Sequence, residues 1–240
     1  MQFRTQDGIA VPAVTAEQMR EVDRIAVEEF GLGILQMMEN AGRNLALNVL
    51  DMLGGARGEV TVLAGAGGNG GGGLCCARHL HNRGFKVWLV LDRDARTLAG
   101  AARDQLCILQ TAGLQPVDAS QARETILESQ VVVDSLIGYS LRGAPRGRAA
   151  ELIALCNQHA ARILSLDVPS GLNATAGGAP GVVIRPERTL TLALPKTGLH
   201  SVPGELFLAD IGIPPEVYGR LDISFEPLFG QEYWIPLLVE

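Results

Sequence analysis

Three short segments of the chain place a carboxylate or an amide beside glycine, directly after an apolar run of strand type. In open α/β sheets, ligands bind beyond the carboxyl ends of the strands, so we expect the three segments to border one cleft. The alternative interpretation of each aspartate is that it caps a helix or a turn. The segments are residues 67–70 with Asn69, residues 134–147 beginning with Asp134, and residues 167–171 with Asp167 and Ser170.

The functional interpretation gives the two carboxylates different roles. One carboxylate in a cleft can accept and return a proton. The other can bind a cation together with the side-chain oxygens of Asn69 and Ser170, because hard cations prefer oxygen ligands. One carboxylate among neutral oxygens suits a cation of low charge such as K⁺ better than Zn²⁺. These residue types therefore predict proton transfer beside a cation site.

A dense glycine run stands between the first apolar strand-like segment and a helix. Seven glycines lie within residues 65–73, after the β-branched run at 60–63 and before helical spacing that starts at Leu74. Glycine lets the main chain approach a ligand, and the free N–H groups of a helix start favour an anion. We expect a strand, a glycine loop and a helix that together bind a phosphate. A flexible linker is the other interpretation, but linkers are seldom flanked so tightly by regular elements.

The basic residues of the loops allow two interpretations each. Arg142, Arg146 and Arg148 face either phosphates or solvent. Lys196 belongs either to a turn after Pro195 or to a second phosphate contact at the rim of the site.

Histidine and cysteine show no obvious metal-ligand pattern. His79 and His81 are two residues apart on a predicted helix, so they cannot share a face and are expected at the surface or in packing. The cysteines form no CxxC pair and have no ligand-like spacing with histidine, so we expect buried free thiols. They are Cys75, Cys76, Cys107 and Cys156.

Composition narrows the class of protein. The 240 residues are 47% hydrophobic but only 5% aromatic, which indicates an aliphatic core of the α/β type in a single domain. A net charge of −6 argues against a nucleic-acid partner. No apolar run reaches membrane-spanning length, and the start of the chain lacks a signal-peptide core. We expect a soluble cytoplasmic protein.

The elements that position these residues follow from the alternation of apolar periodicities between residues 60 and 170. Strands alternating with helices predict a three-layer α/β/α, Rossmann-like fold with a mostly parallel sheet and helices on both faces. We expect an N-terminal arm at 1–14, helices from the Thr15–Gln18 capping box, at 34–53, 74–83, 94–113, 120–127, 149–159 and 215–218, and strands at 60–63, 86–91, 114–117, 130–134, 162–166, 182–184, 188–194 and 205–208.

Together these segments resemble the YjeF N-terminal domain family, whose enzymatic members are NAD(P)H-hydrate epimerases. The matching segments follow the family's order over about residues 15–210. They are residues 19–23 (MREVD), 37–43 (MMENAGR), the glycine run with 77–80 (ARHL), Val133-Asp134 with Gly138 and Arg146-Gly147, 165–173 (SLDVPSGLN) and 194–199 (LPKTGL).

The resemblance implies a homodimeric Rossmann-like enzyme that interconverts the R and S forms of hydrated NADH and NADPH (NADHX and NADPHX). A separate ATP- or ADP-dependent dehydratase would then repair the S form, and we expect residues 1–240 to be a single domain without it. By motif, Asp167 would be the catalytic acid/base, and K⁺ would be bound by Asn69, Asp134 and Ser170. The substrate would contact Gly68, Asn69, Gly70, Gly71, Gly72, Gly138, Tyr139, Ser140, Leu141, Arg142, Gly143, Ala144 and Asp167.

The glycine run departs from the family pattern G-N-N-G-G-D-G at two positions. The first asparagine is Gly68 here, and the aspartate is Gly72. The loss of that carboxylate predicts a weakened epimerase. It also leaves open a catalytically inactive protein that binds a nucleotide-like ligand or serves as a dimeric scaffold. A third possibility, an NAD(P)-dependent oxidoreductase, is allowed by Asp92 after the second strand but lacks a recognisable hydride-transfer site.

Overall fold

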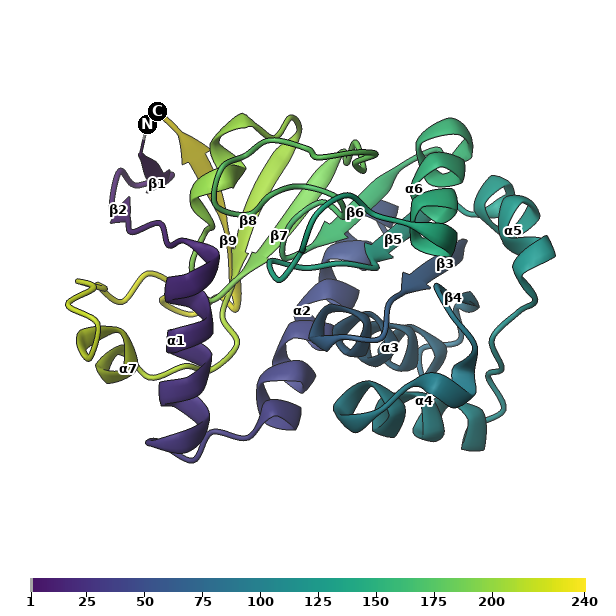
Figure 1. The fold of residues 1–240 in the computed structure, drawn as a ribbon, viewed down its shortest axis with the longest axis horizontal. Helices are drawn as coiled ribbons and strands as arrows, with labels where there is room; N and C mark the ends of the chain where they lie inside the picture. Colours follow the sequence, from purple (N-terminus) through teal and green to yellow (C-terminus); the bar gives the residue numbers. More distant parts are fainter. Residues whose placement is uncertain (1) are drawn as a thin grey trace.

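The computed structural model describes residues 2–240 and contains one nine-stranded sheet (Figure 1). The strand order is β2-β1-β9-β8-β7-β6-β5-β3-β4. Neighbouring strands from β8 to β4 are parallel, whereas β9, β1 and β2 add to one edge in antiparallel orientation. The strands are β1 (Phe3–Thr5), β2 (Ala10–Val11), β3 (Glu59–Ala64), β4 (Lys86–Leu91), β5 (Val131–Ser135), β6 (Ile163–Leu166), β7 (Arg188–Leu192), β8 (Glu205–Ala209) and β9 (Trp234–Val239).

Helices cover both faces of the parallel part of the sheet, which makes a three-layer, Rossmann-like α/β/α fold. Helices α2, α3 and α4 share one core cluster with the sheet, and α5 and α6 share another on the opposite face. Helices α1 and α7 pack together beside the segments that follow β7 and β8. The helices are α1 (Ala16–Glu28), α2 (Ile34–Leu53), α3 (Gly68–His81), α4 (Gly100–Thr111), α5 (Ala122–Glu128), α6 (Gly147–His159) and α7 (Pro215–Gly219).

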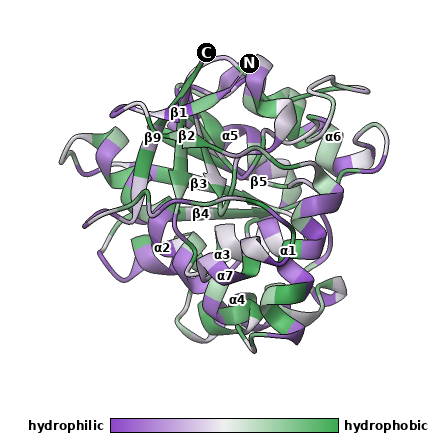
Figure 2. Ribbon diagram, turned by 90° about the vertical axis from the view of Figure 1, so that its left-hand side faces the viewer, coloured by the Kyte–Doolittle hydropathy of each residue, from purple (hydrophilic) through white to green (hydrophobic). Residues whose placement is uncertain are grey.

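The central strands are apolar on both sides because both sides are covered. In β3, Val60 and Val62 point into the cluster under α2–α4, whereas Leu63 points into the cluster under α5 and α6. Strand β5 divides Val131 and Val132 between the two faces in the same way. Figure 2 shows the resulting concentration of hydrophobic residues in the central strands. Continuous β-branched runs of this kind are typical of parallel strands that lie between two helical layers.

The glycine run was predicted to be a loop. Most of it instead forms the first part of a helix. Helix α3 begins at Gly68, six residues before the expected start. A Cβ on Gly70 would lie 1.7 Å from the carbonyl oxygen of Gly65, and one on Gly73 would lie 1.9 Å from Ser135 Oγ. Glycine disfavours a helix by about 1 kcal/mol per residue relative to alanine. The helix therefore forms here because it packs directly on the sheet backbone, and only glycine permits that approach.

The first residues form part of the sheet rather than a separate arm. Strand β1 lies between β2 and β9, and the Phe3 side chain is fully buried. Two backbone hydrogen bonds join Gln2 and Glu240, so the two ends of the described chain lie side by side (Figure 1). Strand β9 was not predicted, and it pairs with β1 and β8.

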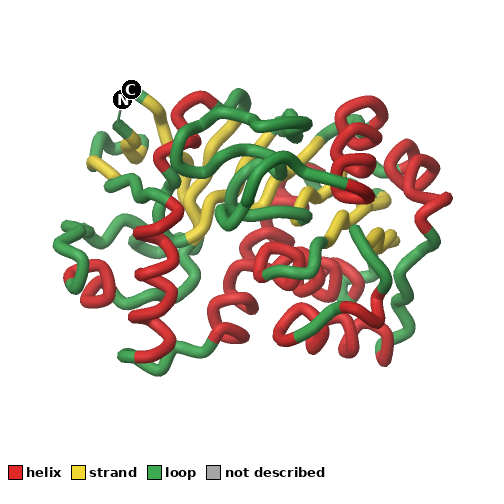
Figure 3. The backbone as a smooth tube through the Cα atoms, in the orientation of Figure 1, coloured by secondary structure: helices red, strands yellow, loops and turns green. Residues whose placement is uncertain are grey.

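The other predicted elements agree with the structure apart from four details. The Thr15–Gln18 capping box starts α1, and α2 has the predicted bounds. Residues 114–117 and 182–184 are not strands, since the first makes a single bridge and the second is irregular (Figure 3). Short 3₁₀ turns capped by Asp94 and Asp118 precede α4 and α5, which start later than expected.

Between residues 2 and 240, the structure contains no helix with the length and apolar character needed to span a membrane.

Candidate active site

A cavity of about 670 Å³ lies beyond the carboxyl ends of the parallel strands. The segments after β3, β4, β5, β6 and β7 line it, and α1 and α2 close one side with Met19, Asp23 and Met38. The topology explains this position, because parallel strands bring the loops at their carboxyl ends to one edge of the sheet. The predicted convergence of the three polar segments is thus present.

Asp167 and Lys196 form a buried ion pair in this cavity. Lys196 Nζ donates to Asp167 Oδ1 and, at 2.8 Å, to the carbonyl of Leu192. The Tyr139 backbone N–H donates to Asp167 Oδ2 at 3.2 Å. The Asp167 and Lys196 side chains are only 5% and 1% exposed, so the pair sits almost entirely out of water. Lys196 therefore belongs neither to a simple turn nor to the rim of the site.

The backbone at Asp167 is left-handed, with φ of 68°. Aspartate adopts this region more readily than most residues but still at a cost of roughly 1–2 kcal/mol. Its N–H donates to the Leu190 carbonyl at 2.7 Å, which continues the hydrogen bonding between β6 and β7. The turn after β6 thereby directs the carboxylate into the cavity instead of along the strand.

Asp23 and Tyr139 form a second carboxylate contact next to this pair. Tyr139 Oη donates to Asp23 Oδ2 at 2.5 Å, and the Tyr139 ring lies 5.8 Å from Lys196 Nζ. Burial raises the pKa of Asp23, against the opposing effect of the tyrosine hydrogen bond. Burial, together with the Asp23 charge, also raises the pKa of Tyr139. Asp23 was not among the predicted site residues, although it lies in a segment that resembles the family.

Asp134 is fully buried behind the cavity and accepts several hydrogen bonds. Ser170 Oγ donates to Oδ1 at 2.5 Å, the Ser170 N–H donates to Oδ2 at 2.9 Å, and Ser165 Oγ donates to Oδ2 at 2.8 Å. Among residues 2–240, no basic side chain forms an ion pair with this carboxylate. Desolvation raises the pKa of Asp134 despite these hydrogen bonds. A buried carboxylate without a countercharge is suited to a cation.

Asn69 is the third residue that was predicted to bind a cation. Its amide lies against Gly138, where an added Cβ would be 3.2 Å from Asn69 Oδ1. Asn69 Nδ2 is buried and has no hydrogen-bond partner in the described structure. Rotating the amide by half a turn would replace this nitrogen with an oxygen. The metal-ligand atoms would then all be oxygens, from Asn69, Asp134, Ser170 Oγ and the nearby Ile137 carbonyl. Such a set fits a hard cation of low charge.

The start of α3 and several arginines give the cavity a region suited to phosphate. Gly67 and Gly68 line the cavity at the N-terminus of this 14-residue helix, where free N–H groups favour anions. Arg142, Arg146 and Arg148 also line it, together with Arg93, which sequence reasoning had not proposed. Arg142 and Arg146 are exposed and Arg93 is paired with Asp92, so contact of these arginines with phosphate stays a prediction.

The predicted site residues divide into two groups. Most of them line the cavity: Gly68, Asn69, Gly72, Gly138, Tyr139, Ser140, Leu141, Arg142, Ala144 and Asp167. The others, Gly70, Gly71, Gly143, Asp134 and Ser170, are not part of its wall.

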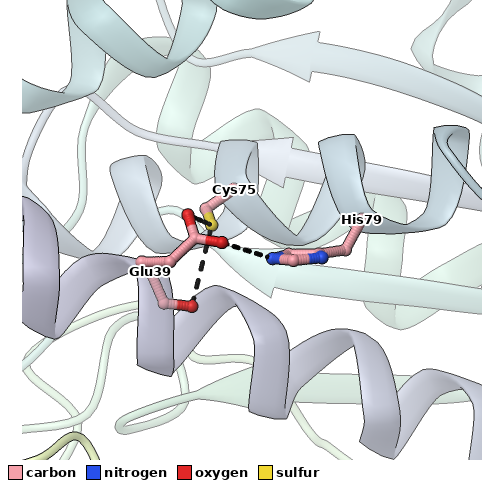
Figure 4. A group of neighbouring side chains, drawn as sticks. All are labelled: Glu39, Cys75 and His79. Atoms are coloured by element: carbon pink, nitrogen blue, oxygen red, sulfur yellow. Dashed lines mark hydrogen bonds and ion pairs between the residues drawn. The ribbon is translucent and has the colours of Figure 1, made fainter.

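A second polar cluster lies outside the cavity, between α2 and α3 (Figure 4). It brings Glu39 together with Cys75 and His79, which are one helical turn apart. The prediction that no cysteine has ligand-like spacing with a histidine is wrong, because Cys75 and His79 share a helix face. Burial raises the pKa of the Cys75 thiol to about 12. Cys107 differs from the other cysteines, and from the prediction, in being exposed.

Comparison with known proteins relates the chain to nicotinamide-nucleotide repair enzymes. The family described as YjeF-related protein N-terminus matches residues 34–198. An NAD(P)H-hydrate epimerase of Dehalogenimonas lykanthroporepellens is 52% identical over 99% of this chain and 97% of its own length. An NAD(P)H-hydrate epimerase of Rhodopirellula baltica is 32% identical over 90% of both chains.

A longer relative and a solved structure complete the comparison. The bifunctional NAD(P)H-hydrate repair enzyme Nnr of Salinibacter ruber is 35% identical over 89% of this chain, but the match spans only 43% of that protein. The crystal structure of the yeast protein YNL200c superposes with a TM-score of 0.84 and covers 94% of this chain and 100% of that one. At 22% identity, that superposition bears on the fold alone.

Proposed function

The chain belongs to the YjeF-related protein N-terminus family, and from this premise we propose that it is an NAD(P)H-hydrate epimerase, an isomerase that interconverts the R and S forms of NADHX and NADPHX. The observation that carries the proposal is the 52% identity with an NAD(P)H-hydrate epimerase over nearly the full length of both chains. The buried Asp167–Lys196 pair in the cavity is the chemical group that the reaction needs. Because relatives matched over their full length are named epimerases, we do not favour a non-catalytic scaffold.

The reaction inverts one carbon of the hydrated nicotinamide ring. C6 carries a hydroxyl group next to the ring nitrogen. Protonation lets this hydroxyl leave as water, while the nitrogen lone pair stabilises the cation that remains. Water then adds to the opposite face of C6 and returns one proton to the enzyme, which leaves the atoms and charges balanced. The enzyme must therefore hold one transferable proton beside the ring.

We assign this proton transfer to Asp167, with Lys196 as its positioning partner. The ion pair holds a proton between a carboxylate and an amine, both of which are nearly excluded from water. The Lys196 proton can pass through Asp167 to the leaving hydroxyl, which leaves a carboxylate and a neutral amine, and the incoming water returns one proton to the pair. Tyr139 fixes the other carboxylate oxygen through its N–H and contacts Asp23 through its hydroxyl.

We further propose that Asn69, Asp134 and Ser170 hold a K⁺ ion. When bound, the ion would supply the positive charge that the buried Asp134 carboxylate lacks. Ser170 already bridges Asp134 and the Ile137 N–H, so the same residues join the segments after β5 and β6. Their role is to keep the two segments that carry Tyr139 and Asp167 in one arrangement.

The nucleotide portion of the substrate fits the other part of the cavity. Its phosphates would lie at the N-terminus of α3 near Gly68, with Arg142 and Arg146 as further partners. The hydrated ring would then reach Asp167. This orientation makes the predicted substrate contacts, from residues 68–72 and 138–144, parts of one binding surface.

The setting of the enzyme follows from the same proposal. We propose a cytoplasmic homodimer that comprises one YjeF N-terminal-type domain per chain. Its S product would be consumed by a separate NAD(P)HX dehydratase, a link supported by the relatives that are named bifunctional NAD(P)H-hydrate repair enzymes. Size-exclusion chromatography with light scattering measures the oligomeric state directly.

A coupled assay tests the epimerase. R-NADHX is incubated with the protein, ATP and an NAD(P)HX dehydratase that consumes only the S form, in KCl or in choline chloride of equal ionic strength. We expect R-NADHX to disappear faster than by spontaneous epimerisation, and faster in KCl. Loss at the spontaneous rate in both salts would exclude the activity. The Asp167→Asn variant, assayed in parallel, controls for contaminating epimerase.

A further inference from the structure

We propose that Glu39, Cys75 and His79 form a binding site for one divalent cation of the Zn²⁺ type. The three side chains come from α2 and α3 and meet at the helix interface, outside the cavity wall (Figure 4). The proposal does not rest on the epimerase activity, and the site differs in chemistry from the oxygen-only donors around Asp134.

The distances fit such an ion. One ligand atom from each residue lies within 4.8 Å of the other two. His79 Nε2 is 2.8 Å from Glu39 Oε1, and Cys75 Sγ is 3.3 Å from Oε2, the other oxygen of the same carboxylate. Tetrahedral zinc with bonds of about 2.0–2.3 Å needs its ligand atoms roughly 3.3–3.7 Å apart. Only small side-chain movements therefore separate the present cluster from a coordination sphere.

The backbone holds the three residues in place. Cys75 and His79 are four residues apart on α3 and so project from the same face. Gly42 on α2 lies directly against Cys75, because a Cβ added to Gly42 would be 2.4 Å from the Cys75 Cβ. This close approach places Glu39, one turn before Gly42, over the thiol. The geometry thus depends on helix packing and not on flexible loops.

The ligand types select the class of metal. Thiolate, imidazole and carboxylate together are typical of zinc and other borderline-soft cations, whereas K⁺ and Mg²⁺ prefer oxygen alone. The Glu39 side chain is 42% exposed and that of His79 is 13% exposed, so the ion can enter from the solvent side. Three protein ligands leave the fourth tetrahedral position to water, as in open zinc sites.

Arg78 shapes the site without excluding the ion. Its guanidinium donates to Glu39 Oε2 and lies 3.3 Å from Cys75 Sγ. A metal bound through Glu39 Oε1 leaves Oε2 to Arg78, which then orients the carboxylate as an outer partner.

Binding changes the protonation of the thiol. Cys75 Sγ now donates its proton to Glu39 Oε2. When sulfur binds the cation, the S–H bond breaks, the sulfur keeps the electron pair and the proton passes to buffer. One proton is therefore released for each ion bound. No oxidant or reductant takes part.

Cobalt titration of the untagged full chain tests the proposal. We expect one Co²⁺ per chain, a thiolate-to-cobalt charge-transfer band, release of one proton and displacement by Zn²⁺. Cys75→Ala should abolish the band and weaken Zn²⁺ binding by more than about 100-fold, since even outer-partner changes cost 10–100-fold. His79→Gln should weaken it at least about tenfold. Cys107→Ser, which removes the exposed thiol, is the matched control and should keep the band.

The outcomes are decisive in either direction. Absence of a charge-transfer band, or a band that survives Cys75→Ala but disappears in Cys107→Ser, would overturn the assignment. Circular dichroism and a thermal melt without metal establish that each variant is folded. If Cys75→Ala fails to fold, His79→Gln decides alone, because unchanged Zn²⁺ affinity in that variant contradicts the site.

Discussion

Asp167 is the residue on which the proposed chemistry most directly depends. We expect Asp167→Asn to lower kcat by about 10²–10⁴-fold, because the amide cannot exchange the proton. The variant should remain folded but less stable, since asparagine is also favoured in the left-handed region that Asp167 occupies, whereas Lys196 loses its buried partner. Steady-state assays with a thermal melt measure both effects. Asp94→Asn, at an exposed carboxylate outside the cavity, is the control and should keep full activity.

Substitution of Lys196 tests the other partner of the buried ion pair. Lys196→Met leaves the Asp167 carboxylate buried without a partner, so we expect it to destabilise the fold by about 3–5 kcal/mol. The Asp167→Asn/Lys196→Met double variant should recover much of that loss because no unpaired charge remains. Urea unfolding measures the cycle. Lys86→Met, at the exposed pair with Glu59, should cost less than about 1 kcal/mol. Strict additivity would mean that the two side chains are not coupled.

Because Asp134 is buried without a countercharge, we expect the stability of the protein to depend on both K⁺ and pH. Its raised pKa means that the folded state binds the proton more tightly than the unfolded state. Without K⁺, its contribution to stability should therefore fall as pH rises from the unfolded pKa of about 3.9 through the raised folded value. K⁺ competes with the proton, so stabilisation by K⁺ should be largest above that value and disappear below it.

Thermal melts in KCl and in choline chloride over a pH series measure this effect. At a K⁺ concentration of 100 times Kd, the stabilisation should be about 2.7 kcal/mol. Asp134→Asn should remove the difference between the two salts. Equal melting temperatures in both salts at neutral pH would contradict a cation at Asp134.

Sequence reasoning identified most of the residues around the cavity but not their partnerships. Asp134, Asp167 and Asn69 could be proposed because each lies at or after the end of a strand, and these ends share one edge of the sheet. For Lys196 the sequence indicates a turn or a phosphate contact at the rim, and only the parallel pairing of β6 and β7 places it beside Asp167. Asp23 is contributed by α1, outside the alternating strand–helix region, and no local pattern predicts that contact.

At the scale of elements, α3 forms part of the cavity wall through Gly72. Substitution of this glycine by aspartate should increase the activity. A Cβ added to Gly72 would meet only the end of the Leu166 side chain, at 2.8 Å, and Gly72 lines the cavity. We expect Gly72→Asp to fold and to raise kcat/KM by about 10–100-fold, which corresponds to roughly 1.4–2.7 kcal/mol of transition-state stabilisation. The coupled epimerase assay measures the change.

Gly70→Ala provides the contrast for that experiment. Its Cβ would collide with the Gly65 backbone, which cannot move without shifting β3, so this smaller change should destabilise the fold by about 1–3 kcal/mol or more. If Gly72→Asp instead unfolds the protein or leaves kcat/KM unchanged, the missing loop carboxylate does not limit the activity.

The elements that were predicted well share strong local signals. Helix α2 has a clear apolar stripe and a closing glycine in the left-handed region at Gly54, and its bounds matched. The early start of α3 was missed because glycine disfavours helices, and the deciding contacts with Gly65 and Ser135 are tertiary. Strands β1 and β9 were missed because they pair residues from opposite ends of the chain, which no local pattern reveals.

At the scale of the whole molecule, the sheet is completed where strand β1, near the start of the chain, pairs with strand β9, near its end. Phe3 is fully buried where β1 fills the position between β2 and β9. We expect Phe3→Ala to destabilise the protein by about 3–5 kcal/mol, as for other buried phenylalanines. Phe30→Ala, where the residue is 37% exposed, should cost no more than about 1 kcal/mol. Denaturant unfolding compares the two, and similar losses would mean that β1 is peripheral to the cooperative fold.

The pairing of β1 with β9 also determines how the molecule responds to mechanical force. The two strands are antiparallel and Phe3 is opposite Val239, so Gln2 and Glu240 lie at the same end of the ladder. A load applied between these two residues pulls the strands apart from that end and breaks their hydrogen bonds one after another. Handles at residues that load β3 against β5 would instead shear a parallel ladder, whose bonds must break together. The molecule should thus be mechanically weak along the axis through its ends and much stronger across its centre.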